Sequence, residues 1–219
     1  MRPSLDALLA EELRTDGAVM ERTLSAARAE LAQRRPVRRW RTQATWVFTA
    51  SAGLTAVVAG VLLVLGRTSG AVLLGRTPLL ALLWATSAVC TWGAISPRGR
   101  KLEPWGVMMA VASAAALVFA RGPASGETTL PEWVCTISHV GVGLVPLVVA
   151  VAVLRGTVFR PLRALLAGLS VGTTGAFLGE LACTLSWQHV VGYHLSAWAI
   201  VAVVTLAVSM SLKPRSFAP

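Results

Sequence analysis

The sequence has 219 residues, of which 55% are hydrophobic and only 14% are charged, and its formal net charge is +10. Because soluble domains carry about one quarter charged residues, this composition excludes an ordinary soluble domain over most of the chain. The basic residues stand in short clusters between apolar runs rather than along one polar face, which argues against direct nucleic-acid binding. Residues 1–20 contain acids and lack the apolar core of a signal peptide, so we expect the N-terminus to stay in the cytoplasm.

Residues 1–43 are predicted to form a short cytoplasmic head made of amphipathic helices. The break at Asp16-Gly17 separates two amphipathic stretches, and Pro36 ends the second one. Some forty residues are too few to bury a core of their own, so their apolar stripes need a partner surface. That surface is either the chain's own inner face, the lipid headgroups, or a cytoplasmic protein that the stripe clamps as a helix in a groove. The predicted partner-binding side chains are Leu5, Leu8, Leu9, Leu13, Met20, Leu24 and Leu31.

Residues 44–212 are predicted to form a transmembrane domain, and residues 213–219 a short cytoplasmic tail. A helix needs roughly 20 mainly apolar residues to cross the hydrocarbon core of a bilayer. Six runs come near this length, although the third is short: Ala44 to Gly66, Pro78 to Ser96, Pro104 to Ala120, Pro131 to Leu154, Leu162 to Leu185 and Val190 to Leu212. The predicted fold is therefore all-α, a six-helix transmembrane bundle that follows an amphipathic helical head.

The distribution of basic residues predicts the orientation of these spans. Nine arginines precede the first run, three basic residues lie in the second loop, three lie in the fourth, and two lie in the tail. The alternate loops hold only Arg67, Arg76 and Arg121. Since cytoplasmic loops are enriched in Lys and Arg, this bias of seventeen against three places both termini in the cytoplasm and supports the count of six spans.

Reactive side chains gather at the predicted outer boundary of the membrane. Cys135 and His139 lie four residues apart on one helix face of the fourth span, and Glu180 and Cys183 lie three apart on one face of the fifth. Two histidines follow in the last outer loop and at the start of the sixth span. The candidate sensing or metal-binding residues are Cys135, His139, Glu180, Cys183, His189 and His194. Three chemistries fit them: copper or zinc coordination, a disulfide between the two cysteines, and oxidation of the thiols. The spacing matches no diagnostic zinc pattern, so the prediction depends on location.

Other small or polar residues of the spans are predicted to have packing roles. Cys90 lies in an inner half of the membrane, where a small apolar filler is expected. The fifth span carries four glycines three or four residues apart, which let another helix approach closely. These glycines are Gly168, Gly172, Gly175 and Gly179.

The chain lacks the sequence patterns of the common enzyme and transporter classes. We find no paired intramembrane acids, metalloprotease helix, nucleotide loop or serine-histidine pattern, and we expect no enzyme activity. A reactive cluster outside, a binding head inside and packed helices between them form the layout of a transmembrane signalling device. The alternative is a copper- or zinc-handling transporter or chaperone that uses the cysteines and histidines as ligands.

The leucine-bearing head, the six spans and the segment Gly179-Glu-Leu-Ala-Cys183 with His189 and His194 resemble the NrsF-type integral membrane anti-sigma factors. The resemblance implies that the head sequesters an extracytoplasmic-function sigma factor at the bacterial inner membrane, so that transcription is repressed, carotenoid synthesis being one candidate output. It implies release on an envelope signal such as light-generated singlet oxygen or copper, with the Cys183–His194 segment in the sensor. Thr184 stands where the family pattern has proline. The expected partners are thus a sigma factor, membrane lipid and a second copy of the chain.

Overall fold

The computed structural model describes residues 17, 19–30, 40–97, 99–121, 131–157 and 159–212, and the chain divides into residues 1–39 and residues 40–219. Within the described residues the protein is all-α, as predicted, and contains no strand. The elements of the second unit are α2 (Trp40–Val64), α3 (Gly70–Ile95), the 3-10 turn η1 (Gly99–Lys101), α4 (Glu103–Phe119), α5 (Trp133–Leu154), α6 (Pro161–Ala182), α7 (Trp187–His189), the π-helical η2 (Val190–Leu195) and α8 (Ser196–Ser211).

Five helical segments in the described residues are long and apolar enough to cross a membrane, which makes this a membrane protein. They are α2, α3, α5, α6 and the continuous stretch from α7 to α8. The remaining predicted span corresponds to α4, an apolar helix of 17 residues that is shorter than the others. Apart from the start of α3, the helices follow the predicted apolar runs to within four residues.

The start of the second predicted span differs from the structure. We expected this span to begin near Pro78, but α3 begins at Gly70 and Pro78 lies inside it. The Ser69 side chain accepts a hydrogen bond from the backbone N–H of Val72, which caps the helix at its true start. A proline inside a helix is tolerated in membrane proteins because neighbouring groups can satisfy the freed carbonyl.

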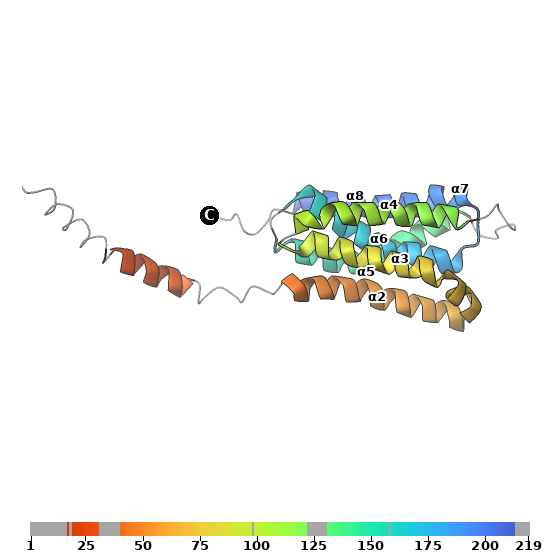
Figure 1. Cartoon of the computed structure of the whole chain (residues 1–219), viewed down its shortest axis with the longest axis horizontal. Helices are drawn as coiled ribbons and strands as arrows, with labels where there is room; N and C mark the ends of the chain where they lie inside the picture. The colour runs from red at the N-terminus through yellow and green to blue at the C-terminus, as the bar shows by residue number, and fades with distance from the viewer. Residues whose placement is uncertain are drawn as a thin grey trace, which may run out of the picture. The chain divides into compact units, whose positions relative to one another are not determined.

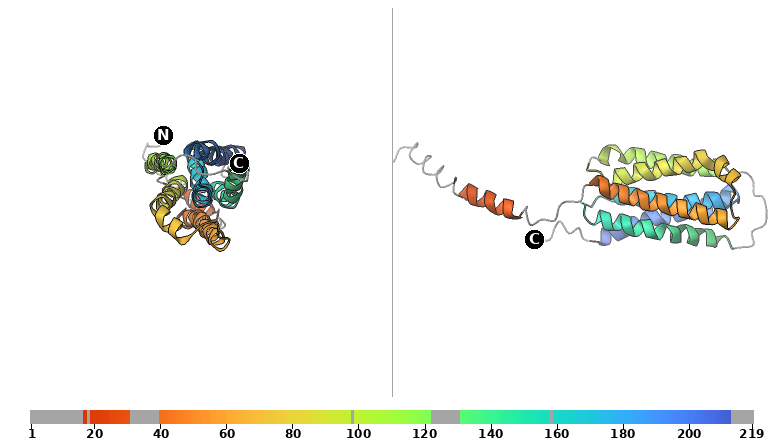
Figure 2. Two further views of the ribbon diagram at one scale, coloured as in Figure 1. Left: turned by 90° about the vertical axis from the view of Figure 1, so that its right-hand side faces the viewer. Right: turned by 90° about the horizontal axis from the view of Figure 1, so that it is seen from below.

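The least hydrophobic span lies at the centre of the bundle. The apolar stretch of α6 has a mean hydropathy of 1.3 and is 83% buried, whereas that of α2 has a mean hydropathy of 2.2 and is 17% buried. Lipid requires apolar side chains, while close helix packing favours Gly, Ala, Ser and Thr, which are frequent in α6. Accordingly α6 contacts α2, α3, α4, α5 and α8, and the other helices surround it (Figures 1 and 2).

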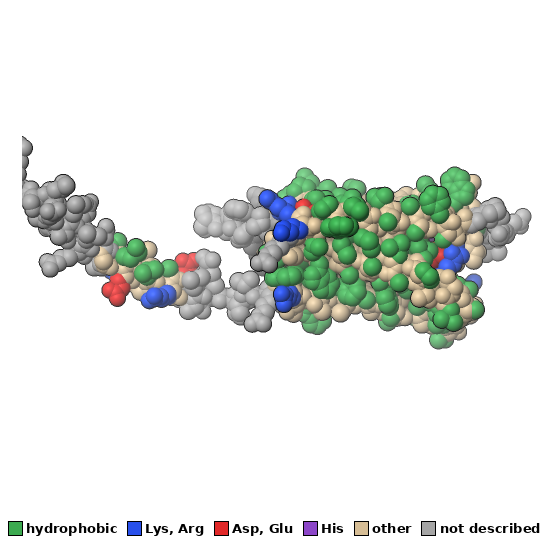
Figure 3. All heavy atoms as spheres, viewed as in Figure 1, with side chains coloured by type: hydrophobic (Ala, Val, Ile, Leu, Met, Phe, Trp, Pro, Cys, Tyr) green, Lys and Arg blue, Asp and Glu red, His purple; other side chains and the backbone are tan. Residues whose placement is uncertain are grey.

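The interior contains two apolar clusters, and hydroxyl groups of α3 and α6 meet inside the bundle. One apolar cluster joins α2, α3, α5, α6 and α8, and a second joins α3, α4, α6, η2 and α8. Between α3 and α6 the hydroxyl of Ser170 contacts those of Ser87 and Thr91 at 3.1 and 2.5 Å. The surface between the two ends is mostly hydrophobic (Figure 3), as expected where a bundle faces lipid.

The two ends of the bundle differ in chemistry. At the end where α2 begins, here called the basic end, Lys and Arg side chains gather (Figure 3). Their described members are Arg41, Arg100, Lys101, Arg155, Arg160 and Arg163. The opposite end, here called the Cys/His end, contains the junctions between α2 and α3, α4 and α5, and α6 and α7. It carries Arg67, Arg76 and Arg121.

The first unit contributes a described helix at residues 19–30. Its apolar residues Val19, Met20 and Leu24 are 55%, 61% and 46% exposed. The predicted partner-binding residues Leu5, Leu8, Leu9, Leu13 and Leu31, and the tail 213–219, lie outside the described residues.

Candidate functional site

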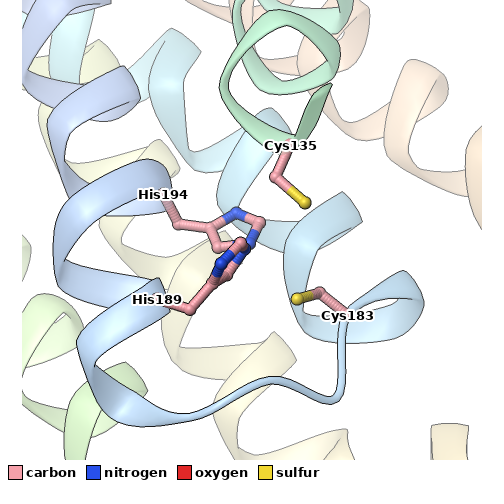
Figure 4. Close-up of side chains that lie close together, drawn as sticks. All are labelled: Cys135, Cys183, His189 and His194. Carbon is pink, nitrogen blue, oxygen red and sulfur yellow. The ribbon is translucent and has the colours of Figure 1, made fainter. Parts of the chain in front are cut away.

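Four of the predicted site residues converge at the Cys/His end. Cys135 comes from the first turn of α5, Cys183 ends α6, His189 ends α7, and His194 lies in η2. Their side chains point toward one another (Figure 4), and the two sulfur atoms and one ring nitrogen of each histidine all lie within 4.8 Å of one another. Both cysteines carry free thiols. The site thus offers two sulfur and two nitrogen donors from three segments of the chain.

The π-helical turn explains why both histidines face the site. In a regular α-helix, residues five apart point about 140° away from each other. The π turn Val190–Leu195 has i→i+5 geometry, which returns residues five apart to the same side. The rings of His189 and His194 therefore lie 5.3 Å apart between centroids, at an interplanar angle of 63°.

Glycines of α6 make room for two imidazole rings. A Cβ atom added at Gly179 would collide with the His194 ring, and one added at Gly175 would collide with the His139 ring. His139 lies beside the cluster rather than in it. Its Nε2 pairs with the Gly172 carbonyl at 3.0 Å, and its ring centroid is 6.1 Å from that of His194.

The cluster histidines are buried without hydrogen bonds. His189 and His194 are 4% and 5% exposed, and neither ring nitrogen of either residue has a hydrogen-bond partner. The nearest charged group to His189 is Glu132, whose Oε1 lies 3.9 Å from Nδ1. Burying a polar group without a partner costs about 1–3 kcal/mol, so such groups call for an explanation.

Glu180 takes part in a separate ion-pair network. Its carboxylate is fully buried and pairs with Arg76 and with Arg121, each at 2.8 Å. The Arg121 guanidinium also donates to the backbone carbonyls of Gly179 and Cys183, which lie at the C-terminal end of α6. Arg121 therefore neutralises Glu180 and caps the C-terminal end of its helix.

The pairing of Glu180 with two arginines was not predicted from the sequence. Arg76 and Arg121 stood out there only as exceptions to the positive-inside bias. An acidic side chain within the membrane needs a basic partner at the same depth. Because Arg76 and Arg121 are two of the three basic residues on the predicted outer side, the pairing could have been predicted from the sequence.

A cavity of about 200 Å³ borders the cluster. Its lining includes Cys135, His139, Cys183 and His194, together with the α6 glycines Gly175 and Gly179. Three of the four cluster residues thus border this cavity. A second cavity, of about 280 Å³, borders the Glu180 network on the other side of Cys183.

One known protein matches over the entire length of this chain. The sequence is 58% identical, over 221 residues, to the carotenogenesis protein CarR of Myxococcus xanthus, and the match covers 100% of both chains. The chain belongs to the CarR family. The match confirms a likeness to CarR over the head as well as the helical domain. No family model and no solved structure matches the sequence.

Proposed function

We propose that this protein is a membrane-bound anti-sigma factor that represses carotenoid synthesis. In this proposal the head holds an extracytoplasmic-function sigma factor at the inner membrane and releases it on an envelope signal, either light-generated singlet oxygen or copper. The observation that carries the proposal is the 58% identity to the carotenogenesis protein CarR from end to end. Because the match covers both the head and the membrane domain, it favours a function that uses both parts of the chain.

The proposed topology has six crossings with both termini in the cytoplasm. The 17 residues of α4 extend about 25 Å, slightly less than the roughly 30 Å hydrocarbon core, so α4 completes the sixth crossing with little tilt. The basic end then faces the cytoplasm, in agreement with the positive-inside rule. The Cys/His end faces outward, where an envelope signal arrives.

The apolar face of the head helix supports a protein partner. Val19, Met20 and Leu24 are exposed on a helix that also carries Glu21, Arg22, Arg28 and Glu30. An amphipathic helix of this kind binds by laying its apolar residues into a groove of another protein. Acidic residues in the head disfavour an anionic lipid surface as its main target.

The test places a negative charge in this apolar face. The double variant Met20→Asp and Leu24→Asp should release the sigma factor from the membrane fraction and cause carotenoid synthesis in the dark, because carboxylates are costly to bury in an apolar groove. Ala29→Asp is the control for a carboxylate on the other face of the helix. It adds one negative charge nine residues from Met20, about 180° away around the helix, where the double variant adds two. Dark repression that persists in the double variant, with the protein at normal levels, would refute the proposal.

A metal-handling transporter or chaperone is the second candidate, and the convergence of Cys135, Cys183, His189 and His194 favours it. The two functions separate on deletion of residues 1–33. Copper or zinc flux into vesicles that survives the deletion supports transport, whereas loss of repression without any flux supports the anti-sigma function.

A further inference from the structure

We propose that Cys135, Cys183, His189 and His194 form a four-coordinate site for a thiophilic d10 metal cation, Zn²⁺ or Cu⁺. The proposal is independent of the function of the head. It begins from the donor set, since two thiolates and two imidazoles are ligands that both cations accept.

The distances between the donor atoms suit such a site. A tetrahedral zinc site with arms of 2.0–2.3 Å has edges of about 3.3–3.8 Å. The four donor atoms already lie within 4.8 Å of one another. Metal binding would therefore need only side-chain adjustments of about 1 Å, and the bordering cavity of about 200 Å³ gives room for them and for entry of the ion.

The unpaired histidine nitrogens are the independent observation that points to a ligand. His189 and His194 are at least nine-tenths buried, face the thiols, and have no hydrogen-bond partner on any ring nitrogen. Two adjacent buried imidazoles without hydrogen-bond partners are energetically unfavourable, and a metal ion would give one nitrogen of each ring a partner. If His189 coordinates the metal through Nε2, its Nδ1 still faces the carboxylate of Glu132. In many proteins a carboxylate in this position orients a metal-bound histidine.

The charges of a zinc-loaded site would balance. Binding of Zn²⁺ would release one proton from each thiol, and the resulting complex of one dication and two thiolates is neutral. Neutrality lowers the cost of burying the ion at the membrane boundary.

Such a site would join separate parts of the bundle. Cys135 belongs to α5, Cys183 to the end of α6, and the two histidines to the segment that leads into α8. A bound metal would clamp these three segments, whereas loss of the metal or oxidation of the thiols would release them.

The test uses the purified full-length protein in detergent micelles, loaded separately with Zn²⁺ and with Cu⁺ and freed of excess metal. We expect about one equivalent of metal per chain and, for the Co²⁺-substituted protein, the absorption of tetrahedral thiolate coordination. Competition with a chromophoric chelator measures the affinities and shows which of the two ions is preferred. Cys135→Ser and His194→Gln should each weaken binding at least about tenfold.

Cys90→Ser is the matched control. Cys90 is fully buried and remote from the site, and a serine hydroxyl can donate to the Gly106 carbonyl as its thiol does. Circular dichroism and gel filtration check that each variant folds. Wild-type protein that retains neither metal, or a folded Cys135→Ser protein that binds as tightly as Cys90→Ser, would overturn the proposal. The head variant Met20→Asp and Leu24→Asp should bind metal normally, so failure of this site and failure of the anti-sigma proposal remain distinguishable.

Discussion

The buried Glu180 network allows a quantitative prediction about stability. In Glu180→Gln the side chain keeps its shape but loses its charge, so two guanidinium groups lose their counter-ion. The Glu180 carboxylate is fully buried, the Arg121 side chain is 5% exposed, and the Arg76 side chain is 33% exposed. Breaking a buried pair by removing one partner costs about 3–5 kcal/mol, and because glutamine can still accept one hydrogen bond we expect about 3 kcal/mol.

The two arginines should contribute unequally to this stability. Arg121→Gln loses the buried pair and the hydrogen bonds to the α6 carbonyls, each worth about 1 kcal/mol, so it should destabilise at least as much as Glu180→Gln. Arg76→Gln should cost at most about 1 kcal/mol, because solvent screens a partly exposed pair. Unfolding in mixed detergent and SDS micelles, followed by tryptophan fluorescence, measures these differences. The reasoning is refuted if Glu180→Gln lies within 1 kcal/mol of wild type, or if Arg76→Gln costs as much as Arg121→Gln.

The α6 glycines give two further predictions. Gly172→Ala should destabilise the protein by about 1–3 kcal/mol, because its Cβ would collide with the Trp198 ring. Gly141→Ala, whose Cβ meets nothing within 4 Å, should be neutral or stabilising. Equal unfolding midpoints for the two variants would contradict this prediction. Gly179→Ala should displace His194 and weaken metal binding about tenfold more than Gly141→Ala does, measured by the same chelator competition.

Hydrophobicity was enough to predict the helices because a backbone in lipid must satisfy its own hydrogen bonds. That constraint fixes helices wherever about 20 apolar residues follow one another, and the observed helix bounds agree with the predicted runs. It does not fix where a helix starts outside the membrane. The α3 start was misjudged because Pro78 resembles a first-turn proline, while the cap at Ser69 lies before a stretch interrupted by Arg76.

The sequence was enough to predict where the site lies, but not which residues form it. The sequence placed six reactive residues near one membrane boundary, but it could not separate the four that converge from His139 and Glu180. That separation depends on the π turn that turns His189 and His194 to one side, and on glycines opposite His139 and His194. A five-residue spacing reads as two faces of an α-helix, and a π turn has no sequence signature strong enough to correct it.

The position of α6 relates the two ends of the molecule. Its C-terminal end carries Glu180 and Cys183, and at its other end Arg163 donates to the Ser96 carbonyl at 2.7 Å. The buried residues of α2, which follows the head in the sequence, all lie within its first two thirds: Ala44, Val47, Ser51 and Thr55. Ala44 and Val47 pack in the same apolar cluster as Leu166, Ala167 and Val171 of α6. Because close-packed interiors transmit small displacements rather than absorb them, a shift of α6 caused at the Cys/His end would reach α2, the helix that follows the head in the sequence.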